Sequence, residues 1–163
     1  MAHKINKMSP NSPDLSPQQR EELATLWNSH PGMKHMGAEV DLSTPGEVRA
    51  FIDPIQPHHR GGLGTQAVNG AVIAGMFDLV IGLTGFFHVR GRRAGVAQLN
   101  IQFLRPVEGD RFDVRGRPTR VGKNLIFAAA ELTDEQGNVC ARCDGIMAVS
   151  GSAAPGTTPT ISL

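Results

Sequence analysis

The stretch AVNGAVIAGMFDLVIGLTGFF, residues 67–87, decides the fold of this chain of 163 residues. It carries one charged residue, Asp78, close to its middle, and it is rich in glycine and alanine. Its length and apolar character predict a long helix that the rest of its own domain covers on every side. A carboxylate buried there without a partner would be costly, so the presence of Asp78 needs an explanation.

A run of about 20 apolar residues is also long enough to span a bilayer. The carboxylate near its centre, the small residues along it and the strand-like sequence downstream argue against a membrane span. The flanks add positive charge on both sides, from Arg60, Arg90, Arg92 and Arg93. We therefore expect a helix buried in protein and a chain without a membrane partner.

The composition excludes several classes of protein. The 16 Lys+Arg and 15 Asp+Glu residues leave a net charge of +1, which argues against a nucleic-acid partner. The first residues contain no apolar segment typical of a secretory signal. Two cysteines, Cys140 and Cys143, do not make a disulfide scaffold. A cytoplasmic protein is the simplest expectation.

The remaining elements are short and follow one another closely. Ser16-Pro17 supplies an N-cap and a first-turn proline, which predicts a helix over residues 17–29. Met33 to Val40 leads into a first strand and Glu47 to Ile52 into a second, and a Gly- and Pro-rich loop follows. Alternating apolar residues with period two predict further strands near 98–103, 112–117, 124–133 and 138–149.

Short turns between strands produce antiparallel neighbours. About six such strands, curled around one long central helix, form the α+β layout known as the hotdog fold. We expect this domain to occupy residues 17–150, with flexible tails at 1–16 and 151–163 that are low in large apolar residues.

From about Gly37 to Val149 the chain resembles hotdog-fold acyl-CoA thioesterases of the phenylacetic-acid-degradation (PaaI-like) type. In that family a His-Gly-Gly-like turn opens the helix, and a catalytic acid follows nine residues after the histidine. Here the turn reads Asn69-Gly70-Ala71, and Asp78 stands nine residues past Asn69. The segments LNIQFLRPVEGD, RVGKNLIF, LTDEQGNVCA and GIMAV then follow in the family's order. The resemblance implies hydrolysis of an acyl-CoA thioester without a metal or organic cofactor.

The chain also departs from the family pattern. Asn69 replaces the histidine, and Ala71 replaces the second glycine. Val96 stands where some members carry a hydroxyl, and HHRGGLGT offers no clear counterpart to an asparagine often found upstream. These departures bear on the rate and the substrate rather than on the fold.

Two residues carry the expected chemistry. Gly70 at the helix N-terminus can present a free backbone N–H to a developing oxyanion, because it has no side chain to block close approach. Asp78 is the candidate general base or nucleophile. They are eight residues apart, about 12 Å along a helix, so one thioester cannot touch both in the same subunit. We therefore expect a homodimer or homotetramer with active sites shared between antiparallel helices. The alternative for Asp78 is a buried acid that accepts backbone N–H bonds.

Other site residues are weaker candidates. Asn69, Ala71, His59, Arg60 and Val96 are expected to contact the substrate. Arg93, Arg120 and Lys123 are candidates for the phosphates of coenzyme A. A metal site at His58-His59 is disfavoured, because this pair has no clear third ligand. A redox or zinc role for Cys140 and Cys143 is also disfavoured, because residues three apart in a strand point to opposite faces.

Two other functions stay open beside the thioesterase. One is a non-catalytic acyl-CoA-binding protein that kept the fold and lost its catalytic groups. The other is a hotdog dehydratase or hydratase, which we rank low because it requires a histidine paired with the acid at a defined spacing. The acyl group is open between small aryl and medium-chain aliphatic groups.

Overall fold

The computed structural model describes residues 15–61, 65–89 and 92–151. Its elements are α1 (Pro17–Ser29), α2 (Pro31–Met36), β1 (Glu39–Asp41), β2 (Val48–Ile52), a 3-10 turn η1 (Pro57–His59), α3 (Gly70–Phe86), β3 (Arg93–Phe103), β4 (Phe112–Val121), β5 (Leu125–Asp134) and β6 (Val139–Ser150). The expected tails lie almost entirely outside the described residues.

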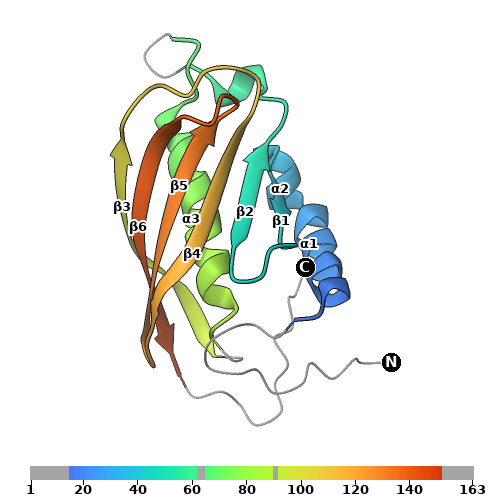
Figure 1. Cartoon of the computed structure of the whole chain (residues 1–163), viewed down its shortest axis with the longest axis vertical. Coiled ribbons are helices and arrows are strands. Elements are labelled where there is room, and N and C mark those ends of the chain that lie inside the picture. The colour runs from blue at the N-terminus through green and yellow to red at the C-terminus, as the bar shows by residue number, and fades with distance from the viewer. Residues whose placement is uncertain (1–14, 62–64, 90–91, 152–163) are drawn as a thin grey trace.

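The strands form one antiparallel sheet in the order β1-β2-β4-β5-β6-β3. Figure 1 shows α3 on the concave side of this curved sheet, with α1 and α2 beside β1. The predicted α+β hotdog architecture is confirmed. Because β4, β5 and β6 follow one another through short turns, they lie side by side, whereas β3 returns to the far edge next to β6.

The N-terminal region contains one element that the sequence did not predict. The helix α1 begins as expected, because the Ser16 side chain accepts the Gln19 N–H and the Gln19 side chain accepts the Ser16 N–H in return. The helix α2 occupies residues where a strand was expected to begin. Pro31 starts it, and Gly37, at φ 63°, ends it in the left-handed conformation that glycine adopts readily.

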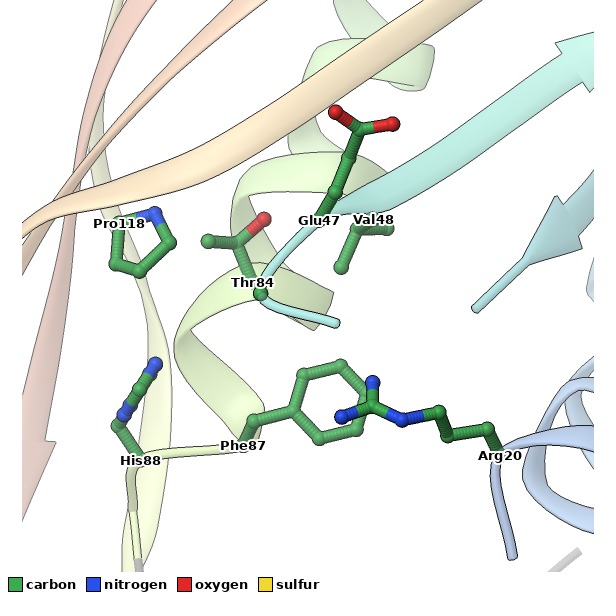
Figure 2. A pocket seen from close by; sticks show the side chains of 8 residues that line it. Arg20, Glu47, Val48, Thr84, Phe87, His88 and Pro118 are labelled. Atoms are coloured by element: carbon green, nitrogen blue, oxygen red, sulfur yellow. The ribbon is translucent and has the colours of Figure 1, made fainter. Parts of the chain in front are cut away.

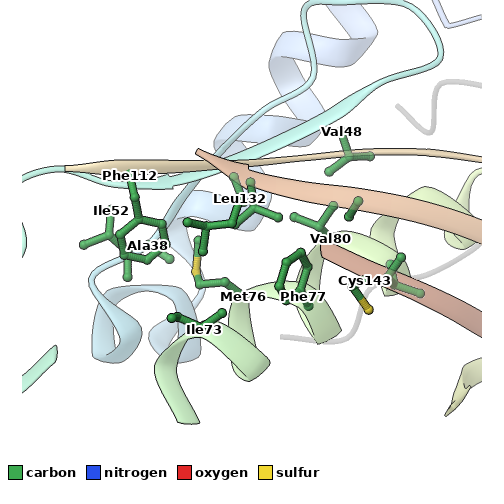
Figure 3. Packing of buried hydrophobic residues seen from close by; sticks show 14 of the residues in the cluster. Ala38, Val48, Ile52, Ile73, Met76, Phe77, Val80, Phe112, Leu132 and Cys143 are labelled. Atoms are coloured by element: carbon green, nitrogen blue, oxygen red, sulfur yellow. The ribbon is translucent and has the colours of Figure 1, made fainter. Parts of the chain in front are cut away.

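The helix α3 packs closely on the sheet through large residues on one face. Figure 3 shows Met76, Phe77 and Val80 pointing from α3 toward the strands, and each is fully buried. Gly145 on β6 makes room for this face, because a Cβ there would lie 2.6 Å from the Cγ2 atom of Ile81. The core therefore depends on bulky residues of the helix opposite small residues of the strands.

The expectation that α3 is buried on every side is wrong for a single chain. Ala71 and Asp78 are exposed, and Gly75 and Gly82 between and beyond them are half-buried. Their spacing places these four residues on one stripe of the helix. We call this stripe the open face of α3.

The open face exists because the neighbouring elements cover only part of the helix. The sheet packs on one side of the helix, and the N-terminal helices approach on another side. There the rings of Trp27 and Phe86 meet edge to face, with 6.4 Å between the ring centres. Within the described residues β3 pairs with β6 alone, so its outer edge is also uncovered. None of the described helices is long and apolar enough to be a candidate membrane span.

Candidate active site

The N-terminus of α3 carries one unused hydrogen-bond donor. The Asn69 side chain accepts the Ala71 N–H at 2.8 Å, and the Asn69 carbonyl accepts the N–H groups of Val72 and Ile73 at 3.0 and 3.2 Å. Among the described residues nothing accepts the N–H of Gly70. The positive end of the helix dipole therefore coincides with one free backbone donor, an arrangement suited to a developing negative charge.

Phe103 forms a wall beside this donor. Its Cε1 and Cζ atoms would lie 3.6 and 3.7 Å from a Cβ placed on Gly70. Phe103 is 58% exposed and Leu104 is 51% exposed, so an apolar surface adjoins the helix N-terminus. We did not single out Phe103 as a site residue from the sequence. The sequence signal that could have identified it was its place in the period-two alternation with Leu99 and Ile101.

Asp78 lies on the open face of α3, about two turns from Gly70. Its side chain is exposed in the single chain, so the expectation that it is buried is wrong here. It makes no hydrogen bond or ion pair with any described residue, which removes the alternative of an acid held by backbone N–H groups within its own chain. The carboxylate is therefore available to a ligand or to a second copy of the chain.

His59 has a different environment from the one we expected. The residue is only 2% exposed, and both ring nitrogens are engaged: Nδ1 accepts the Gln56 N–H and Nε2 bonds to the Met36 carbonyl, each at 2.9 Å. Burial lowers the pKa of His59, although the bond to Met36 acts in the opposite direction. The ring therefore has no polar atom left to offer a substrate.

Arg60 is also engaged in holding its loop. Its guanidinium donates to the carbonyls of Gln66 at 2.9 Å and Gly109 at 2.7 Å, and it lies 3.7 Å from the Asp110 carboxylate. Val96 is half-buried next to Gly82, where a glycine Cβ would lie 3.6 Å from its Cγ2. Val96 thus lies near the open face, and Arg60 connects two loops.

The three basic candidates lie at the opposite end of α3 from Gly70. Arg93 begins β3 and is in register with Ser150, while Arg120 lies near the end of β4 with its guanidinium 6.0 Å from the Phe127 ring centre. Lys123 is exposed in the turn that follows. The helix spans 17 residues, about 25 Å, so these side chains do not reach Gly70 of their own chain.

The cysteines and the small cavity are separate from this region. Cys140 and Cys143 are buried, and burial raises the pKa of Cys143 to about 11, so neither is an activated thiol. The cavity in Figure 2 measures about 10 Å³ and lies at the C-terminal end of α3. It is lined by Thr84, Phe87 and His88 together with residues of α1, β2 and β4. It has room for about one water molecule, which is too small for an acyl group.

Comparison with known sequences and structures agrees with this architecture. Residues 65–141 match the model of the thioesterase superfamily. The chain has the hotdog fold, and its central segment carries the thioesterase-superfamily pattern. This match agrees with the expected resemblance to hotdog-fold thioesterases. No curated protein matches the chain.

Three solved structures illustrate the likeness. A thioesterase from Haemophilus influenzae is 20% identical with a TM-score of 0.71, over 81% of this chain and 90% of that one. The PaaI protein of the E. coli phenylacetic acid degradation operon is 17% identical with a TM-score of 0.69, over 84% and 95%. A Streptococcus mutans protein bound to acetyl CoA is 21% identical with a TM-score of 0.58, over 67% and 85%. At these identities the structures show a shared fold.

Proposed function

We propose that this protein is an acyl-CoA thioesterase that hydrolyses a small aryl- or medium-chain acyl-CoA to the free acid and CoA. The observation that carries the proposal is the free N–H of Gly70 at the N-terminus of α3, on the same helix as the exposed carboxylate of Asp78. The superfamily match over residues 65–141 supports the reaction class. The acetyl CoA bound to a structural neighbour supports the substrate class.

In the proposed reaction the thioester oxygen accepts a hydrogen bond from Gly70 N–H as negative charge develops on it. Asp78 takes a proton from the attacking water, or itself attacks the carbonyl carbon to give an anhydride that water then opens. The carbon–sulfur bond breaks, and the CoA thiolate leaves and is protonated. A single turnover in ¹⁸O-labelled water distinguishes general-base catalysis from an anhydride that water opens at the Asp78 carbonyl. The general-base route places the label in the free acid, whereas the anhydride route places it in the Asp78 carboxylate and releases unlabelled acid.

The proposed assembly is a homodimer or a homotetramer in which two copies of α3 run antiparallel. The open face of α3 and the free edge of β3 are the surfaces that a second copy would cover. With Asp78 of one copy beside Gly70 of the other, the two residues are no longer separated by about 12 Å of helix. The same arrangement carries Arg93, Arg120 and Lys123 of one copy beyond the helix N-terminus of the other, where they suit the phosphates of CoA.

The proposal is tested by thiol release from a panel of acyl-CoAs, followed with a thiol-reactive dye. We expect Asp78→Asn to lower kcat by about 10²–10⁴-fold with little change in KM, because the amide cannot accept the proton. Its melting temperature should stay near that of the parent, since Asp78 has no partner within its chain. Near-parental kcat in this variant would refute a catalytic Asp78. Tight binding of acyl-CoA with no turnover by the parent would instead favour the non-catalytic binding protein.

A further inference from the structure

His59 connects three segments that meet at the N-terminus of α3. Its ring accepts the Gln56 N–H through Nδ1, and Nε2 lies 2.9 Å from the Met36 carbonyl oxygen at the end of α2. Its own carbonyl accepts the N–H of Asn69, the N-cap residue of α3, at 2.8 Å. One buried residue thus joins α2, η1 and the residue directly before Gly70.

The hydrogen bonds fix both the protonation state and the tautomer of the ring. Because the Gln56 N–H can only donate, Nδ1 must be unprotonated. Nε2 therefore carries the hydrogen and donates it to the Met36 carbonyl. A protonated ring would place an N–H against the Gln56 N–H, so this arrangement requires neutral His59.

The backbone around the ring is shaped to admit it. A Cβ on Gly37 would lie 3.0 Å from Cε1 and 3.1 Å from Nε2 of His59. Contacts that short are tighter than ordinary van der Waals packing, so the ring lies directly against the glycine backbone. The ring therefore has little space to move, and the backbone carbonyl of His59 is held in place with it.

We infer that His59 is a positioning residue for the Gly70 N–H, acting through the hydrogen bond between its carbonyl and the Asn69 N–H. The inference rests on the proposed function for its effect on catalysis, but not for its effect on the helix N-terminus. Asn69 fixes the first turn through its side chain and carbonyl, so the direction of the Gly70 N–H follows the placement of Asn69. His59 therefore contributes to catalysis without touching the substrate.

Three variants separate the two ring contacts. His59→Asn keeps an acceptor for the Gln56 N–H, His59→Gln keeps a donor toward the Met36 carbonyl, and His59→Phe keeps the ring volume without either. His58→Asn is the control for loss of a neighbouring ring without loss of a hydrogen bond, because His58 is exposed and its ring centre lies 4.0 Å from that of His59. Amide hydrogen exchange by ¹⁵N NMR reports the Asn69 N–H directly, with the buried Val80 on the same helix as the internal reference.

We expect the Asn69 amide to exchange about tenfold faster in His59→Phe, with smaller increases in the other two His59 variants and none in His58→Asn. Val80 protection should stay unchanged. The kcat should fall about tenfold or more in His59→Phe and less in the other two His59 variants. KM should change little, since the oxyanion donor acts chiefly in the transition state. If His59→Phe does not fold, His59→Asn and His59→Gln should still each show faster Asn69 exchange and a lower kcat than the parent.

Unchanged Asn69 exchange in folded His59 variants would overturn the inference, whatever the activity. Faster Asn69 exchange with parental kcat would also overturn it, because the helix N-terminus would then move without effect on turnover. A parent protein that hydrolyses no acyl-CoA would refute the proposed function alone. The exchange experiment would then still decide whether His59 positions the N-cap.

Discussion

At the scale of single residues, the site depends on which backbone groups the first turn of α3 uses itself. Asn69 occupies the N–H groups of Ala71, Val72 and Ile73 and leaves that of Gly70 free. The sequence was sufficient to place Gly70 at the start of the helix, where backbone N–H groups lack partners within the helix. It could not show that His59 is buried, because a loop histidine has the same sequence signal whether it faces solvent or backbone.

Replacing Gly70 with valine tests the donor. A Cβ there would lie 3.6 Å from the Phe103 ring, an ordinary contact, so we expect little change in the free energy of unfolding. The branched side chain would occupy the approach to the N–H and lower kcat by about 10²–10³-fold, as loss of an oxyanion donor does. Gly70→Ala should give a smaller loss. Parental turnover in Gly70→Val, measured with purified folded protein, would show that the oxyanion is held elsewhere.

Stability should depend on pH through His59. Burial lowers the pKa of the folded imidazole below its ordinary value of about 6.5, so between the two pKa values the unfolded chain binds more protons. The contribution of neutral His59 to the free energy of unfolding is complete above about pH 6.5. It is lost as the pH falls through the pKa of His59 in the folded protein. His58 and Arg60 carry the neighbouring charges, while Met36, Gly37 and Asn69 do not ionise. The free energy of unfolding, measured with urea between pH 5 and 7.5, should change less steeply with pH for His59→Gln than for the parent. An equal dependence on pH in the two proteins would contradict this assignment.

At the scale of elements, the sequence predicted α1 from its N-cap and first-turn proline, α3 from its length and apolar character, and β3 to β6 from their period-two alternation. It missed α2, whose six residues make fewer than two turns. It also could not distinguish a helix covered by its own domain from one that a second copy covers. Both situations favour apolar and small residues around the whole helix.

The contact between α3 and the sheet makes its own prediction. Gly145→Ala would bring a Cβ within 2.6 Å of the Ile81 side chain, so we expect a loss of about 1–3 kcal/mol in the free energy of unfolding. Ile81→Ala alone should also destabilise, by leaving a cavity. The double variant should lose less than the sum of the two, because the new methyl group enters the space that Ile81 vacates. Strict additivity in chemical denaturation would show that the two positions do not meet.

At the scale of the whole molecule, one chain carries the parts of the proposed site but does not bring them together. Gly70 and Asp78 are separated along α3, and the basic residues lie at its far end. The sequence spacing alone predicted the first separation, since a helix has a fixed rise per residue. The position of Arg93, Arg120 and Lys123 depended on the strand order, which spacing does not give.

Subunit complementation tests the shared site most directly. Gly70→Val and Asp78→Asn subunits, each inactive alone, are co-expressed with different affinity tags, and the mixed assemblies are purified through both tags. If each site takes Gly70 from one copy and Asp78 from the other, a mixed dimer contains one intact site and should show about half the parental kcat per dimer. Mixed dimers as inactive as the two parent variants would contradict a site shared between subunits.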